Sequence, residues 1–162
     1  MANQFNDNVG NSTLGMALLY GKGSAAGSVS TWTRVPDVKN LPALGSEPNG
    51  IDTTTIAETV QETQVSGLKS ANTLEVTANF TNALEACWNT GVCGISLSTN
   101  EKLFFCWYHP SLTNASAFVG DPTPLDFGDS DVNSVLETSL YITMASSPVR
   151  IARPTTITEY SA

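Results

Sequence analysis

The chain has 162 residues, with 15 acidic and seven basic residues and a formal net charge of −8. This length suits one domain whose core can fold without a metal or a disulfide. The acidic balance argues against sequence-independent nucleic-acid binding and against docking on anionic lipid, which both depend on Lys and Arg. No stretch approaches the ~20 apolar residues of a membrane-spanning helix.

Residues 1–13 are polar and rich in asparagine, which is typical of a flexible arm. They lack the basic residues and the apolar run of a secretory signal peptide, so we expect folding in a cytoplasm. Cys87, Cys93 and Cys106 are then expected to be reduced thiols. Two strands are predicted next, over 15–20 and 29–38, separated by a turn rich in Gly and Ser.

Residues 37–67 form a long segment without a regular hydrophobic pattern. Pro and Gly interrupt its first half, and its second half is polar with three consecutive threonines. Connections longer than about 12–15 residues are uncommon in compact domains and are usually functional or disordered. The Thr, Ile and Val content favours extended pairing with another segment over free coil.

Regular alternation of apolar and polar residues over 73–81 predicts a strand with one buried and one solvated face. A short helix is predicted over 83–89, with Asn82 as its N-cap and Glu85 completing a capping box. Gly91 is expected to end this helix.

A β-hairpin is predicted from 92–97 and 103–108, and its second strand is apolar on both faces. That strand is therefore expected to be central or covered by a neighbouring layer or chain. The later segments are expected to be a polar loop (110–116), short strands (117–119 and 124–127), an acidic turn (126–131), a long strand (132–144) and a C-terminal arm (149–162).

These elements predict one mainly β domain over residues 1–162. Its fold class is a β-sandwich or partly open barrel with one short flanking helix, a long extended loop and terminal arms.

Motifs for catalysis or cofactor binding are weak in this sequence. His109 is the only histidine, and no Gly-x-Ser-x-Gly elbow accompanies it. The three cysteines with His109 have ligand types that suit zinc, but we expect Cys93 and Cys106 on facing hairpin strands among apolar neighbours, as buried thiols. We expect no enzyme, no cofactor and no metal site.

Three acidic residues, Asp126, Asp129 and Asp131, lie close together in the sequence. They have ligand chemistry that suits calcium, but the Gly and Glu positions of an EF-hand loop are absent. A turn in which Asp side chains bond the local backbone is favoured instead.

Four segments of the chain resemble a known family. Residues 32–48 (WTRVPDVKNLPALGSEP) are followed by 51–54 (IDTT) and 65–69 (VSGLK), and 15–20 (GMALLY) provide an opening strand. This pattern resembles the major tail proteins, or tail tube proteins, of long-tailed bacteriophages, most strongly over 32–80.

The resemblance implies a structural virion protein without catalysis. Six copies would close into a ring by pairing strands between subunits, and rings would stack into the tube through which the genome leaves the capsid. Six copies carry a total charge of about −48, so DNA is expected to slide without specific binding. Implied partners are other tail proteins, such as the tape measure and tail-terminator proteins, and the implied location is the phage tail after assembly in the host cytoplasm.

The resemblance also assigns contacts to the loop 37–67 and to the arms 1–13 and 149–162. The residues expected to touch neighbouring subunits are Pro42, Leu44, Pro48, Ile51, Asp52, Thr53, Thr54, Ile56 and Val65. Glu75 and Glu137 lie on alternating strands and are candidate lumen acids.

Two other functions remain open for a β-domain of this kind. One is a head–tail connector or tail-terminator protein, which forms single rings. The other is a carbohydrate-binding β-sandwich, which predicts a solvent-open aromatic platform around Trp107 and Tyr108.

Overall fold

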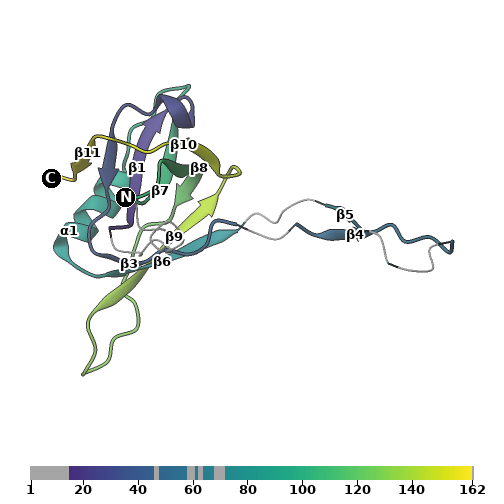
Figure 1. The fold of residues 1–162 in the computed structure, drawn as a ribbon. Helices are drawn as coiled ribbons and strands as arrows, with labels where there is room; N and C mark the ends of the chain where they lie inside the picture. Colours follow the sequence, from purple (N-terminus) through teal and green to yellow (C-terminus); the bar gives the residue numbers. More distant parts are fainter. Residues whose placement is uncertain (1–14, 46–47, 58–60, 62–63, 68–71, 162) are drawn as a thin grey trace, which may run out of the picture.

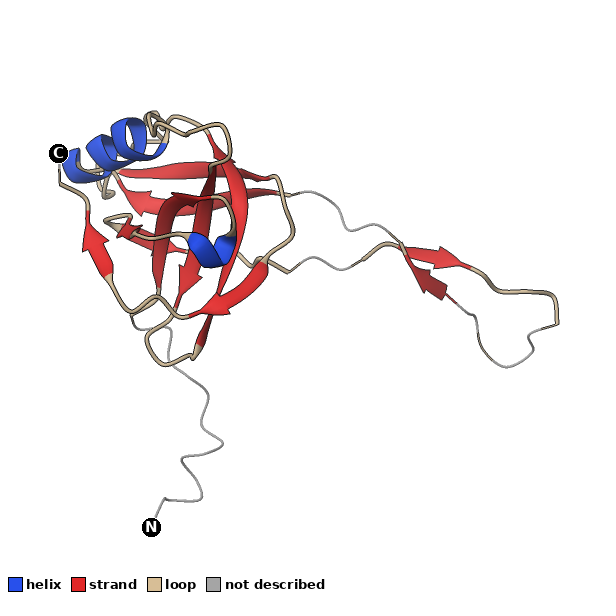
Figure 2. Cartoon of the chain, turned by 90° about the horizontal axis from the view of Figure 1, so that it is seen from above, coloured by secondary structure: helices blue, strands red, loops and turns tan. Residues whose placement is uncertain are grey.

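The computed structural model describes residues 15–45, 48–57, 61, 64–67 and 72–161. Strands form two packed layers, a helical segment lies at one end, and a long hairpin projects from the opposite end (Figures 1 and 2). The mainly β prediction with one short flanking helix is confirmed.

Within the described residues, the main sheet has nine strands in the order β11-β2-β1-β7-β8-β9-β6-β3, and β10 also pairs with β8. All its pairings are antiparallel except β11 with β2. The strands are β1 (Ala17–Gly23), β2 (Trp32–Arg34), β3 (Val38–Asn40), β6 (Thr73–Asn79), β7 (Lys102–Tyr108), β8 (Asn114–Pro122), β9 (Glu137–Met144), β10 (Val149–Ala152) and β11 (Ile157–Glu159). Among the described residues the main path ends at β11 and β3, and β10 has β8 as its single partner, so the sheet is not a closed barrel.

A second, two-stranded sheet lies in the projecting hairpin. It pairs β4 (Gly50–Asp52) with β5 (Gln64–Ser66) in antiparallel register. The extended pairing expected for 37–67 therefore occurs partly within the segment itself.

Apolar side chains cover both faces of β1, β7 and β8. On one face, Leu18, Phe105 and Phe118 enter the main core, which also contains the helix. On the other face, Leu19, Phe104 and Cys106 belong to a second cluster. The expected central position of 103–108 is confirmed, because β7 lies between β1 and β8 and is buried on both sides.

The main core is closed from the far side by β6 and β9. Leu74, Val76 and Ala78 alternate along β6 and point into it, as do Leu140 and Ile142 of β9. The layers therefore run from the second cluster, through β1, β7 and β8, to the main core, and then to β6 and β9, whose polar face is on the outside. The strand predicted over 73–81 is confirmed, ending two residues earlier.

The helical segment differs from its prediction at both ends. It consists of α1 (Asn82–Glu85) continued by the π-helical η2 (Ala86–Val92). Thr81, not Asn82, is the N-cap: its side chain accepts a hydrogen bond of 3.2 Å from the backbone N–H of Leu84. The segment continues past Gly91 because Val92 is fully buried in the main core.

The predicted hairpin of 92–97 with 103–108 is wrong. Val92 belongs to η2, and 93–101 contain no strand. β7 pairs instead with β1 over seven residues, from Ala17 opposite Tyr108 to Gly23 opposite Lys102, and with β8 on its other side. Both hydrogen-bonding edges of β7 are thus taken by other strands.

Other boundaries also moved. The strand expected over 29–38 is divided into β2 and β3 at Pro36 and at Asp37, whose φ is +59°. The piece expected at 117–119 lies within a longer strand, β8, the residues 124–127 form no strand, and the strand expected over 132–144 begins only at Glu137. The segment expected to be a C-terminal arm forms β10 and β11 within the chain's own sheet, with η1 (Ala26–Ser28) beside β10.

Candidate assembly surfaces

The base of the long loop is anchored to the chain's own domain. Leu41 and Leu44 pack against the main core. The indole N–H of Trp107 donates a hydrogen bond of 3.0 Å to the backbone carbonyl of Pro42. Two residues expected at inter-subunit contacts, Pro42 and Leu44, therefore also make contacts inside their own subunit.

Beyond this base, the hairpin leaves the domain and exposes apolar side chains. The backbone N–H of Gly67 donates a hydrogen bond of 2.6 Å to the carbonyl of Asn49. This bond joins the residue that precedes β4 to the residue that follows β5. Ile51 lies directly opposite Val65, so their side chains share one face, and they are 56% and 55% exposed. Ile56 is fully exposed at 105%.

The remaining expected contact residues also lie on the hairpin. Asp52, Thr53 and Thr54 are exposed, and Pro48 is half-buried. The side chain and the backbone of Thr54 bond the Asp52 carboxylate, which lowers the pKa of Asp52, and the backbone bond is 2.9 Å long. An isolated two-stranded hairpin is marginally stable in water, so this one gains most from packing against another surface.

Glu75 and Glu137 lie on one face of the sheet. Glu75 is opposite Tyr141, and Asn79 is opposite Glu137, so both acids belong to the polar face of β6 and β9. The hydroxyl of Ser139 donates to Glu75 at 2.7 Å, and Lys39 on the neighbouring β3 pairs with Glu137. This face, here called the polar face, carries the side chains of Thr73, Glu75, Thr77, Asn79, Glu137, Ser139, Tyr141 and Thr143.

The cysteines and His109 do not form a metal site. In the described part of the chain, no three His, Cys, Asp or Glu side chains are grouped to hold a metal ion. Burial raises the pKa of Cys87 and Cys93 to about 11 and that of Cys106 to about 12, so these thiols stay protonated at neutral pH. His109 is 7% exposed, and its Nδ1 accepts a hydrogen bond of 3.1 Å from the backbone N–H of Ser111. The prediction that Cys93 faces Cys106 across a hairpin is wrong.

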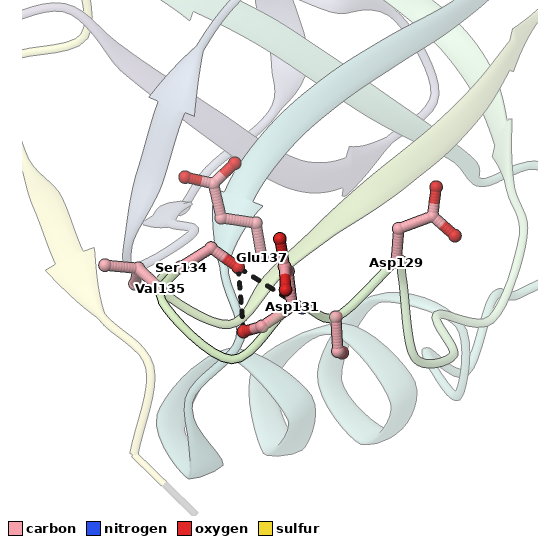
Figure 3. Close-up of a pocket in the computed structure, with 6 residues that line it drawn as sticks. Asp129, Asp131, Ser134, Val135 and Glu137 are labelled. Atoms are coloured by element: carbon pink, nitrogen blue, oxygen red, sulfur yellow. Dashed lines mark hydrogen bonds between the residues drawn. The ribbon is translucent and has the colours of Figure 1, made fainter.

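The acidic turn has the local bonding expected of Asp-rich turns. The Asp126 carboxylate accepts from the N–H of Phe127 at 2.8 Å, and Asp131 accepts from that of Val132 at 2.6 Å. Figure 3 shows the side chain of Asp129 well away from that of Asp131, which lies beside Ser134. Phe127 stacks on Phe80 with ring centroids 4.9 Å apart.

An open aromatic platform is not present at Trp107 and Tyr108. The Trp107 ring lies 5.3 Å from that of Phe118 and is held beneath the base of the long loop. Tyr108 packs against the second cluster. Neither ring is therefore arranged as a flat, solvent-open surface for a sugar.

The edge strands of the sheet could not be identified from local sequence patterns. At the ends of the main strand path, β3 and β11 have no further partner strand among the described residues, and such edges are natural sites for pairing with another chain. Which strands are edges depends on the strand order, and the only sequence sign was the shortness of these segments.

No helix in the described residues is long and apolar enough to span a bilayer.

Solved structures share this fold. A chain of the anti-feeding prophage (AFP) baseplate matches with a TM-score of 0.60 and 10% identity, covering 89% of this chain and 97% of that one. A chain of the sheath–tube complex of the extracellular contractile injection system PVC matches with a TM-score of 0.53 and 12% identity, covering 94% and 99%. A chain of the C6-symmetric tail of an empty GTA particle gives 0.54 and 16%, covering 83% and 96%.

At these identities the structural likeness establishes the fold. A comparison with curated protein sequences found no match. The family described as phage tail tube protein, TTP, matches residues 13–153, which is most of the chain. The chain therefore belongs to the phage tail tube protein family, and its role is that of a structural tail tube protein.

Proposed function

We propose that copies of this protein close into six-membered rings, and that the rings stack into the tube through which a phage genome passes. The observation that carries this proposal is the hairpin of β4 and β5. It projects from the domain with Ile51, Ile56 and Val65 exposed, and its two strands have no third strand within the described chain. Such an element gains its stability in contact with another copy.

Ring closure has support in the sheet. The edges β3 and β11 lie at opposite ends of the strand order, so one copy can offer one edge to the other edge of its neighbour. Such a contact joins two different surfaces, and it closes into a ring when the rotation between copies divides a full turn. The matched GTA tail and AFP baseplate are described with six-fold symmetry, and we extend that symmetry to this chain.

The polar face of β6 and β9 suits the lumen. Among the described residues it carries Glu75 and Glu137, and Lys39 on β3 pairs with Glu137, so these three side chains leave one net negative charge, that of Glu75. An acidic wall repels phosphate and does not retain DNA, and screening confines this effect to within about 8 Å at physiological salt.

The proposal includes the wider assignment of the chain. Residues 1–162 form one tail-tube domain, with contacts to neighbouring subunits from 1–13, 37–67 and 149–162. Partners are the tape measure and tail-terminator proteins of the same tail. Assembly takes place in the host cytoplasm, and the assembled protein is part of the virion.

Electron microscopy of the purified protein tests this function. The full chain is expected to form tubes, whereas a connector or terminator forms single rings. In a variant, residues 50–66 are deleted, so that Asn49 is joined directly to Gly67 and the two form an Asn-Gly turn. This variant is expected to fold but not to form tubes. Long tubes from that variant would remove the hairpin from the assembly mechanism, and a full chain that stays monomeric at every concentration would overturn the function.

A further inference from the structure

A groove runs across the face of the sheet opposite to the polar face. Its walls are η1 with Val29 and Ser30 on one side, and the chain from Val149 to Thr156 on the other. Trp32 and Ile151 of the second cluster provide an apolar floor. Arg150 and Arg153 are the charged residues of this lining, which contains no acid.

This positive charge is unusual in a chain with a net charge of −8. Lys22, Arg34 and Lys39 are each within ion-pair distance of a glutamate. Arg150 is exposed, and among the described residues neither it nor Arg153 pairs with an acid. Arg153 instead donates from its guanidinium to the backbone carbonyl of Pro110, which holds that group at the end of the groove. An apolar floor with a basic rim fits an acidic segment that also carries apolar side chains.

The long hairpin of this same chain has that chemistry. Residues 40–68 contain Glu47, Asp52, Glu58 and Glu62 and no Lys or Arg. Ile51, Val65 and Ile56 provide exposed apolar side chains in the same segment of the sequence. Both the charge and the apolar surface are therefore complementary to the groove.

The hairpin that fills the groove must come from another copy. In Figures 1 and 2 the hairpin points away from its own domain, whereas η1 and β10 lie over the domain. Each leg of about 15 residues reaches up to about 50 Å when extended, enough to cross to the next subunit along a tube. A contact between two different surfaces propagates as a stack.

We propose that the acidic hairpin of one copy docks into the Arg150–Arg153 groove of a copy in the adjacent ring. This inference rests on the proposed tube function and names the receiving surface. If the polar face lines the lumen, the groove lies on the outer wall, so the hairpins clasp the next ring from outside.

Charge reversal at the groove tests the proposal. Arg150→Glu is expected to raise the critical concentration for tube formation about tenfold, because attraction to the hairpin becomes repulsion. Lys102→Glu is the matched control, since it makes the same charge change at an exposed residue outside the groove. Asp52→Lys combined with Arg150→Glu is expected to recover part of the loss. Equal behaviour of Arg150→Glu and Lys102→Glu would overturn the docking site while leaving the tube function intact.

Cross-linking identifies the two partners directly. Chains with Ile56→Cys are mixed with chains with Ala152→Cys, two exposed positions on the hairpin and in the groove. Both chains also carry Cys93→Ser, because Cys93 is the native thiol that is only partly buried. A disulfide-linked pair is then expected under mild oxidation in the mixture and not in either sample alone, since Cys87 and Cys106 are buried. Absence of this pair in assembled tubes, or linkage in the Ile56→Cys sample alone, would overturn the proposal. Wild-type protein that makes no tubes would instead reject the function itself.

Discussion

Gly91 shows how one residue can be important for a reason that the sequence does not reveal. Its position after a predicted helix suggests a helix stop, yet the helical segment continues through Val92. A Cβ at Gly91 would lie 2.7 Å from the ring of Tyr160 and 2.9 Å from the hydroxyl of Tyr20. The residue is small because the end of the chain packs across the helix there.

Replacing Gly91 therefore tests whether the C-terminal segment is part of the folded domain. Gly91→Ala is expected to lower the free energy of unfolding by about 1–3 kcal/mol, because the added methyl group displaces Tyr160. Urea denaturation measures this change. Gly45→Ala is the control: nothing lies within 4 Å of its added Cβ, so stability is expected to hold or to rise by up to about 1 kcal/mol. Equal stability of the two variants would show that Tyr160 does not pack on the helix in solution.

The buried thiols show the opposite case at the residue scale, where composition alone is informative. Free cysteine is among the most buried residue types, and Cys87 and Cys106 are fully buried in separate apolar clusters. The expectation of a buried thiol is therefore confirmed at Cys106. Cys93 is only partly buried, and its position depends on a helix extension that the local pattern did not indicate.

At the scale of elements, the hairpin should separate folding from assembly. Ile51→Thr with Val65→Thr keeps strand-forming residues on β4 and β5 but removes the apolar pair from their shared face. Because both side chains are more than half exposed in the monomer, we expect unchanged monomer stability and a rise of about tenfold or more in the critical concentration for tubes. Sedimentation of assembled material measures this change.

The control for this pair lies in another loop. Val132 and Val135 are 94% and 68% exposed, so Val132→Thr with Val135→Thr makes the same chemical change away from the hairpin. This variant is expected to assemble like the wild type. If both double variants weaken assembly equally, general surface hydrophobicity, not the hairpin, controls tube formation.

Elements with a strong local pattern were predictable, and those set by distant partners were not. The alternation along β6 and the continuous apolar run of β7 indicated one wet face for the first and full burial for the second, as observed. The partners of β7 are β1, whose residues precede their partners by 79 (Gly23 to Lys102) to 91 positions (Ala17 to Tyr108), and β8. No local sequence signal reports such distant pairing. The sequence pattern therefore predicts that residues 92–97 pair with β7, although both edges of β7 are already paired with β1 and β8.

At the scale of the whole molecule, a candidate surface formed by one continuous segment could be identified from the sequence, whereas one formed by distant segments could not. The long segment 37–67 stood out in the sequence, because Pro, Gly and Thr interrupt an otherwise patterned chain, but its folding into a hairpin of β4 with β5 was not predicted. The groove did not stand out, since its walls come from 26–32 and 149–156, which only the folded sheet brings together. The strand register likewise placed Glu75 and Glu137 on one face, a relation that alternation within each strand cannot establish.

The polar face makes a last prediction about the assembled tube. If it lines the lumen, Glu75→Lys introduces six cations per proposed ring against the path of DNA, and tubes are expected to retain short duplex DNA at low salt and release it as salt rises. Co-sedimentation of DNA with tubes measures retention. Glu85→Lys, an exposed site on α1, makes the same charge change at the end of the domain and is expected to retain little. Within the described part of the chain, Glu75 hydrogen-bonds with Ser139 at the sheet surface, so assembly should be unaffected. Equal retention by the two variants would place the polar face outside the lumen.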